Sequence, residues 1–120
     1  FKVAQSQAFD LDNGAGTTKD DCPLRHSKAV KLYNARIVYT GATSGTVAAG
    51  TAQIGSTVGG AEIAAATAYE NAKAVGVKTA LTLLITSVAA DTPIYVRHTG
   101  VAATQAGEAY VEIEYAVMDD

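Results

Sequence analysis

Two short motifs in this 120-residue chain contain residue types that carry out chemistry in enzymes. The stretch YTGATSG (39–45) follows a run of β-branched residues. A glycine-rich turn after a strand can bring backbone N–H groups close to a pyrophosphate. Further along, YENAK places Tyr69 four residues before Lys73, the spacing of a Tyr-x-x-x-Lys catalytic pair. Together the motifs raise the hypothesis of a nicotinamide-dependent oxidoreductase.

The surrounding sequence argues against that hypothesis. The fingerprint of short-chain dehydrogenases/reductases requires a third glycine where this chain has Val47. Residues 46–60 are rich in glycine and β-branched residues, which oppose the helix that must follow the turn. Thr40 and Tyr69 are 29 positions apart (69 − 40), too few for the elements that separate the two motifs in that family. We therefore interpret Gly41–Gly45 as a loop between strands and predict that the protein is not an enzyme.

The acidic segment DLDNGAGTTKDD (10–21) matches a calcium-binding loop only in part. Counted from Asp10, an EF-hand loop requires an oxygen ligand at its fifth position and glycine at its sixth. The chain has Gly14 and Ala15 there. We expect a polar turn and no metal, with a weak structural cation site left open.

The chain has one cysteine and two histidines, which limits nucleophilic and metal chemistry. Cys22 lies four residues from His26, and His98 is far away in sequence. A zinc site usually takes three or four ligands, and a cysteine nucleophile needs a base and an orienting group. We predict no catalytic residue and no cofactor, and interpret Cys22 as a small buried hydrophobe.

Composition describes one soluble globular domain. Hydrophobic residues make up 48% of the chain, charged residues 18%, and the formal net charge is −3. Lysines and arginines are scattered rather than gathered in a stripe, so we predict no nucleic-acid partner. No apolar run approaches the roughly 20 residues of a membrane span, and nothing has the shape of a signal peptide. A lone cysteine excludes an internal disulfide.

The clearest secondary-structure signal is the alternation in EAYVEIEYAV (108–117). It predicts a strand of an antiparallel sheet with one buried and one wet face. The apolar set is Val111, Ile113, Tyr115 and Val117, and the acidic set is Glu108, Glu112 and Glu114. We expect Arg97, on a neighbouring strand, to pair with Glu112 or Glu114.

Four other segments have strand character. Residues 29–40 are rich in Val, Ile, Leu and Tyr, and their parity shifts near Asn34, which predicts a bulge. Residues 51–58, 77–86 and 92–99 are further strand candidates. We predict a mainly β fold, an antiparallel β-sandwich, over residues 28–120.

Two segments are harder to interpret. Residues 1–27 mix Gly, Asp, Asn and Ser with short apolar pairs, so we expect an extended N-terminal arm with one short strand near Phe9 and Leu11. The alanine-rich residues 59–76 permit a short helix near 61–74 or a short strand around Ile63 followed by a polar excursion. Both alternatives stay open at this point.

Three segments in the second half of the chain resemble those of a known protein family: LTLLIT (81–86), ADTPIYVRHTG (90–100) and AGEAYVEIEY (106–115). They resemble small virion structural proteins of tailed bacteriophages, namely capsid decoration (cement) or head-fibre proteins. The resemblance implies a β-sandwich of jelly-roll-like form, made in the host cytoplasm, that binds the outer capsid surface as a homotrimer. Its partner would be the major capsid protein, whose subunits it would bridge.

The first functional hypothesis is therefore a structural virion protein that stabilises a capsid by burying interface area. We predict Phe1, Phe9 and Leu11 as apolar partner-binding anchors on the arm. The alternative is a carbohydrate- or receptor-binding β-sandwich on a phage tail, fibre or cell surface. For that alternative, Tyr110 is the tyrosine that we expect to be partly exposed, because it shares the glutamate face of its strand.

Overall fold

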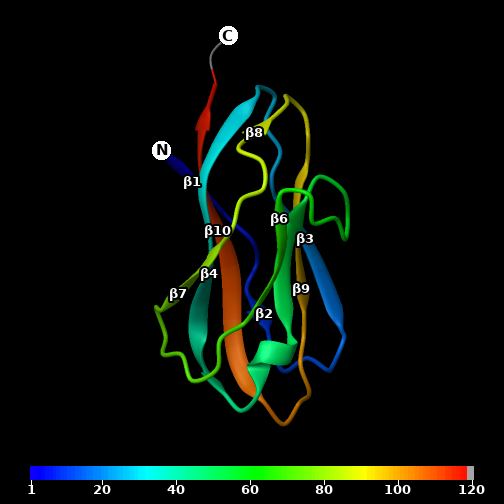
Figure 1. Ribbon diagram of the computed structural model, residues 1–120, viewed down its shortest axis with the longest axis vertical. Coiled ribbons are helices and arrows are strands. Elements are labelled where there is room, and N and C mark those ends of the chain that lie inside the picture. The colour runs from blue at the N-terminus through cyan, green and yellow to red at the C-terminus, as the bar shows by residue number, and fades with distance from the viewer. Residues whose placement is uncertain (119–120) are drawn as a thin grey trace.

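The computed structural model describes residues 1–118 and contains two antiparallel sheets that face each other across one core. The molecule is elongated, with extents of 49 × 24 × 20 Å (Figure 1). The predicted mainly β, antiparallel sandwich is confirmed. No helix among the described residues is long and apolar enough to cross a membrane.

Sheet A is built around two long strands, β4 and β10, which run side by side for most of the length of the molecule (Figure 1). Its strand order is β1-β10-β4-β7, and two short strands add to it, β2 on β10 and β8 on β4. The strands are β1 (Lys2–Gln5), β2 (Phe9–Asp10), β4 (Val30–Ser44), β7 (Lys78–Leu81), β8 (Ser87–Val88) and β10 (Ala106–Val117).

Sheet B has four strands in the order β3-β9-β5-β6. They are β3 (Thr18–Leu24), β5 (Thr51–Gly55), β6 (Ala64–Ala68) and β9 (Ile94–Thr99). A single 3₁₀ turn, η1 (Val47–Ala49), precedes β5. On β9, Ile94, Val96 and His98 face the core and alternate with half-buried neighbours, as a two-residue period requires.

The predicted bulge near Asn34 is present. Leu32 pairs with Tyr115 and Asn34 pairs with Glu114, so Tyr33 is the extra residue on β4. The extra residue resets the alternation, and Leu32 and Ile37 therefore both reach the core despite their opposite parity.

The alanine-rich segment forms a strand, so the helix considered near 61–74 is absent. Residues 64–68 pair with β5, and the N–H of Tyr69 donates to the carbonyl of Gly50. The Tyr69 side chain is buried in the core, where pairing with β5 places it. Tertiary pairing outweighs the helical preference of alanine here.

The strand predicted over 77–86 is shorter than expected. β7 ends at Leu81, and the N–H of Leu84 donates to the carbonyl of Ile63 near sheet B. The chain therefore leaves sheet A after four residues and returns only at β8. YTGATSG also departs from expectation, because β4 continues to Ser44 and the turn begins at Gly45, whose φ of 74° suits glycine.

Residues 1–27, expected to form an arm outside the sandwich, belong to both sheets in this structure. β1 and β2 pair with β10, and β3 pairs with β9. Phe9 and Leu11 lie in the common core. The segment is irregular in sequence because its strands are short, and its apolar residues meet partners that are distant in the chain.

Candidate interaction surfaces

The three predicted anchors lie in two different environments. Phe1 is 85% exposed, whereas Phe9 and Leu11 are 1% and 0% exposed. The latter two can contact another molecule only by leaving the core of this chain. Phe1 is the one of the three that is accessible in the folded state, and its role in partner binding stays a prediction.

Tyr69 and Lys73, the two residues of the YENAK motif that would be catalytic, lie in different environments. The Tyr69 side chain is buried, and its hydroxyl lies 2.5 Å from His98 Nδ1. Lys73 is on a surface turn, where it forms a 3.0 Å ion pair with Glu70. Burial raises the pKa of Tyr69, the opposite of what a catalytic tyrosine requires. No pocket opens among residues 1–118.

His98 is the centre of a polar network inside the core that sequence reasoning missed. Its Nε2 lies 3.5 Å from Ser6 Oγ, which accepts a 2.9 Å hydrogen bond from the N–H of Val111. The Phe9 ring stacks on the imidazole at 5.0 Å between centroids. Desolvation lowers the pKa of His98 to about 4, so the ring is neutral at pH 7. The network joins residues 6–9 to sheet B.

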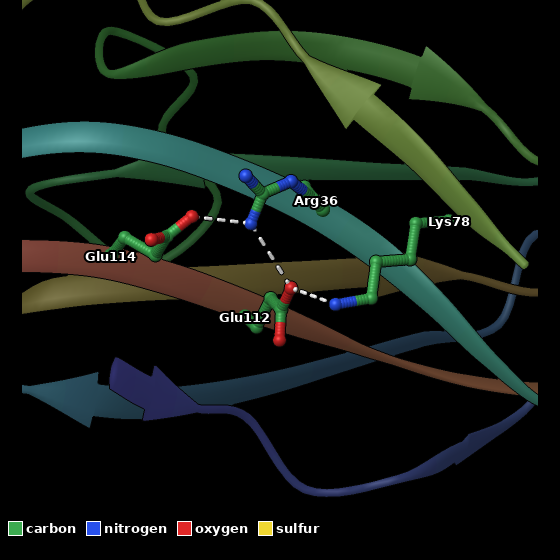
Figure 2. A network of polar contacts seen from close by, with 4 residues as sticks. All are labelled: Arg36, Lys78, Glu112 and Glu114. Carbon is green, nitrogen blue, oxygen red and sulfur yellow. Dashed lines mark hydrogen bonds and ion pairs between the residues drawn. The ribbon is translucent and has the colours of Figure 1, made fainter. Parts of the chain in front are cut away.

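The outer face of sheet A carries a compact ion network, shown in Figure 2. The Glu112 carboxylate accepts a 2.8 Å hydrogen bond from Lys78 Nζ and a 3.2 Å hydrogen bond from Arg36. Arg36 also pairs with Glu114 at 2.5 Å. Burial would raise the pKa of Glu112, but the two cationic donors outweigh it and lower the pKa. The network is balanced, with two cations and two carboxylates.

An aromatic cluster lies on the same sheet near the start of β4. The rings of Phe1 and Tyr33 are 4.5 Å apart, and Lys31 Nζ lies 5.3 Å from the centroid of Tyr33. Val3 beside them is 52% exposed and Tyr33 is 39% exposed. Tyr110, expected to be partly exposed, is so, and Tyr33 is more exposed. Aromatic side chains are enriched in protein interfaces.

Two carboxylates oppose each other directly at the other end of sheet A. Asp10 on β2 pairs in register with Glu108 on β10. Partial desolvation and the carboxylates of Glu108 and Asp12 raise the pKa of Asp10. Like charges directly opposite each other on two strands destabilise a sheet.

Asp10→Asn is therefore expected to increase the free energy of unfolding at pH 7 by about 0.2–1 kcal/mol, the size of a cross-strand pair effect. The raised pKa means that the folded state binds this proton more tightly than the unfolded state does. The repulsion is therefore relieved as pH falls, and the gain should shrink at pH 4. Urea denaturation at both pH values measures this, with Asp91→Asn, which removes an exposed carboxylate outside this group, as the control. A loss of stability at pH 7 would contradict the prediction.

Arg97 does not pair with Glu112 or Glu114, because β9 belongs to the other sheet. Its guanidinium instead donates to both carboxylate oxygens of Asp20 on β3, at 2.7 and 2.9 Å. A cross-strand ion pair was expected and is present, but its carboxylate lies on β3 and not on β10. These hydrogen bonds lower the pKa of Asp20. Cys22, expected to be buried, is exposed on the same strand.

Metal-ligating side chains are not gathered in the described part of the chain. No group of three or more His, Cys, Asp or Glu residues within 1–118 is placed to hold a metal ion. The segment 10–21 contributes its first residue to β2 and its last four to β3.

Comparisons with known proteins give one informative result. No family model and no curated protein matches the chain. Among solved structures, a chain of the cyanophage Pam1 capsid asymmetric unit superposes with a TM-score of 0.64 at 13% sequence identity. The match covers 98% of this chain and 84% of that chain. The two chains share a fold.

The match to the cyanophage Pam1 chain extends over both sheets, because it spans nearly all of this chain. At 13% identity it shows the architecture and carries no site residue across.

Proposed function

We propose that this protein is a non-enzymatic structural virion protein that binds the outer surface of a phage capsid. It stabilises the shell by bridging subunits of the major capsid protein, and it acts as a homotrimer. The observation that carries the proposal is the match over 98% of the chain to a chain of a phage capsid asymmetric unit. The resemblance of its second half to virion structural proteins points the same way.

The surface chemistry supports a binding role. The cluster of Phe1, Val3 and Tyr33 presents exposed apolar and aromatic groups beside the paired charges of the Arg36–Glu112 network. An exposed aromatic centre with a polar surround is the arrangement on which protein interfaces depend. The carbohydrate- or receptor-binding alternative stays a prediction.

The proposal is tested with shells assembled from the major capsid protein of the same phage. Shells are incubated with the purified protein and centrifuged through a sucrose gradient, and particle rupture is then followed during heating. The protein is expected to sediment with the shells at a fixed ratio and to raise their rupture temperature. Phe1→Ala is expected to weaken binding about ten-fold, the effect of losing one interface anchor worth about 1.4 kcal/mol.

Sedimentation of the protein apart from the shells at micromolar concentration would refute the proposal. Binding without any rise in rupture temperature would leave attachment standing and refute stabilisation.

A further inference from the structure

Strand β6 forms an edge of sheet B that the rest of the described chain leaves open. It pairs with β5 on one side. On its other side, among residues 1–118, only its first residue is bridged, by Ala64 to Leu83. Ala65, Ala66 and Ala68 are exposed.

The register shows which backbone groups point to the open side. The N–H of Tyr69 donates to the carbonyl of Gly50, and Ala68 lies opposite Thr51. In an antiparallel pair, hydrogen-bonded and non-hydrogen-bonded positions alternate. Ala68 is therefore at a non-hydrogen-bonded position, and its N–H and C=O point away from β5. The register shifts between Ala52 and Ile54, so this alternation does not extend to Ala66.

The other edge strands of at least four residues are protected against pairing, and β6 is not. β1 and β7 each carry a lysine, and β3 carries a lysine, two aspartates and Pro23. Charges and proline on an edge are the usual protection against an added strand. β6 reads AAATA, without a charge, a proline or a large side chain. Its one irregularity is a register shift opposite Gln53.

Apolar side chains lie at the Ala64 end of this open edge. Leu84 and Ile85 are 57% and 41% exposed, and the N–H of Leu84 donates to the carbonyl of Ile63, next to β6. No charged residue occurs between Thr79 and Ala90. The nearest carboxylates along the chain have partners: Glu62 accepts from the hydroxyl of Ser56, and Glu70 pairs with Lys73. The surface therefore offers a partner main-chain hydrogen bonds and apolar contact, and it presents no charge that the partner would have to complement.

We propose that the β6 edge receives an extended, uncharged, apolar segment of a partner chain as an added strand, with side chains packed on Leu84 and Ile85. This inference rests on the proposed function, in which the partner is a subunit of the capsid shell. Strand addition of this kind takes its affinity from the main chain and its specificity from alternate side chains.

The area of the edge favours a shell subunit over a second copy of this chain. Five residues span roughly 17 Å, so one added strand covers far less than the roughly 800 Å² per partner of a stable interface. Edge pairing alone would not hold two free molecules together. A segment whose own subunit is held at another contact is presented at high effective concentration.

The experiment compares Ala66→Lys with Ala103→Lys, which adds the same charge in an exposed turn outside β6. Both variants are first shown by circular dichroism and thermal unfolding to keep the wild-type fold. Binding to the shells is then measured by sedimentation. Ala66→Lys is expected to weaken binding about ten-fold or more, since a lysine blocks an edge, and Ala103→Lys to change it less than about two-fold.

Hydrogen exchange gives a second readout. The amide of Ala68 is expected to exchange quickly in the free protein and to become protected on shells. If wild type and Ala66→Lys bind shells equally, or if the Ala68 amide stays unprotected on shells, the strand-addition proposal fails while the proposed function stands. If wild type does not bind shells, both fail. A wild-type dimer in solution that Ala66→Lys dissociates would assign the edge to a second copy and overturn the proposal.

Discussion

Phe9→Ala is expected to lower the free energy of unfolding by about 3–5 kcal/mol, the usual cost of emptying a buried phenylalanine site. Phe9 is 1% exposed and its ring stacks on His98 in the core. Its strand, β2, has only two residues, so few main-chain hydrogen bonds compensate for the lost side chain. Urea denaturation of the purified protein measures the loss.

Phe1→Ala is the matched control for this substitution. Phe1 is 85% exposed, and a surface truncation usually changes stability by less than about 0.5 kcal/mol. The pair of variants also separates the two roles predicted for these residues. If Phe9→Ala left stability unchanged and weakened shell binding, Phe9 would be a surface anchor and its place in the core would be refuted.

Acid is expected to destabilise the protein well before its carboxylates are protonated. Desolvation lowers the pKa of His98 from 6.5 to about 4, while Asp21 and Lys19 act on it in opposite directions. Between these values the unfolded state binds a proton that the folded state does not. The stability associated with the neutral ring is complete above pH 6.5 and is lost as pH falls toward 4. The loss amounts to about 2 kcal/mol by pH 5 and about 3 kcal/mol by pH 4.

Urea denaturation at half-unit steps from pH 7.5 to 5 measures this loss. Above pH 5, protonation of Asp20 and Glu112 contributes little, since both have lowered pKa values. His98→Gln should flatten the slope, and His26→Gln, which removes the other histidine, tells a His98 effect from a His26 effect. Following the His98 ring proton by NMR gives the folded-state pKa directly. Stability that does not change between pH 7 and 5 would contradict the prediction.

The sequence predicted the strands whose two faces differ in polarity. In 108–117 the apolar and acidic sets separate by parity, and the structure buries Val111, Ile113 and Tyr115 as expected. The bulge at Tyr33 could also be predicted, because the shift in the alternation of apolar residues occurs within a single strand. The side chains of residues 64–68 are all small and similar in polarity, so periodicity does not distinguish a strand from a helix there. Pairing with β5 makes this segment a strand.

Contacts between distant segments could not be predicted in this way. Nothing near Phe9 in the sequence indicates that its ring meets His98, or that Ser6 and Tyr69 complete the same network. The expected partner of Arg97 was wrong for the same reason, since charge and parity do not say which sheet contains a strand. An edge such as β6 becomes visible only when the order of all the strands is known.

The pairing of β1 with β10 has a consequence for how the protein is made. Lys2 lies opposite Tyr115, 113 positions away (115 − 2). At a synthesis rate of about 5–20 residues per second, the ribosome needs roughly 6–20 s to make the residues between them. Throughout that interval β1 has no partner strand, and Phe9 lacks the β10 residues against which it packs. A chaperone that binds nascent apolar segments would have its longest opportunity there, and the rate of translation would influence the yield of folded protein.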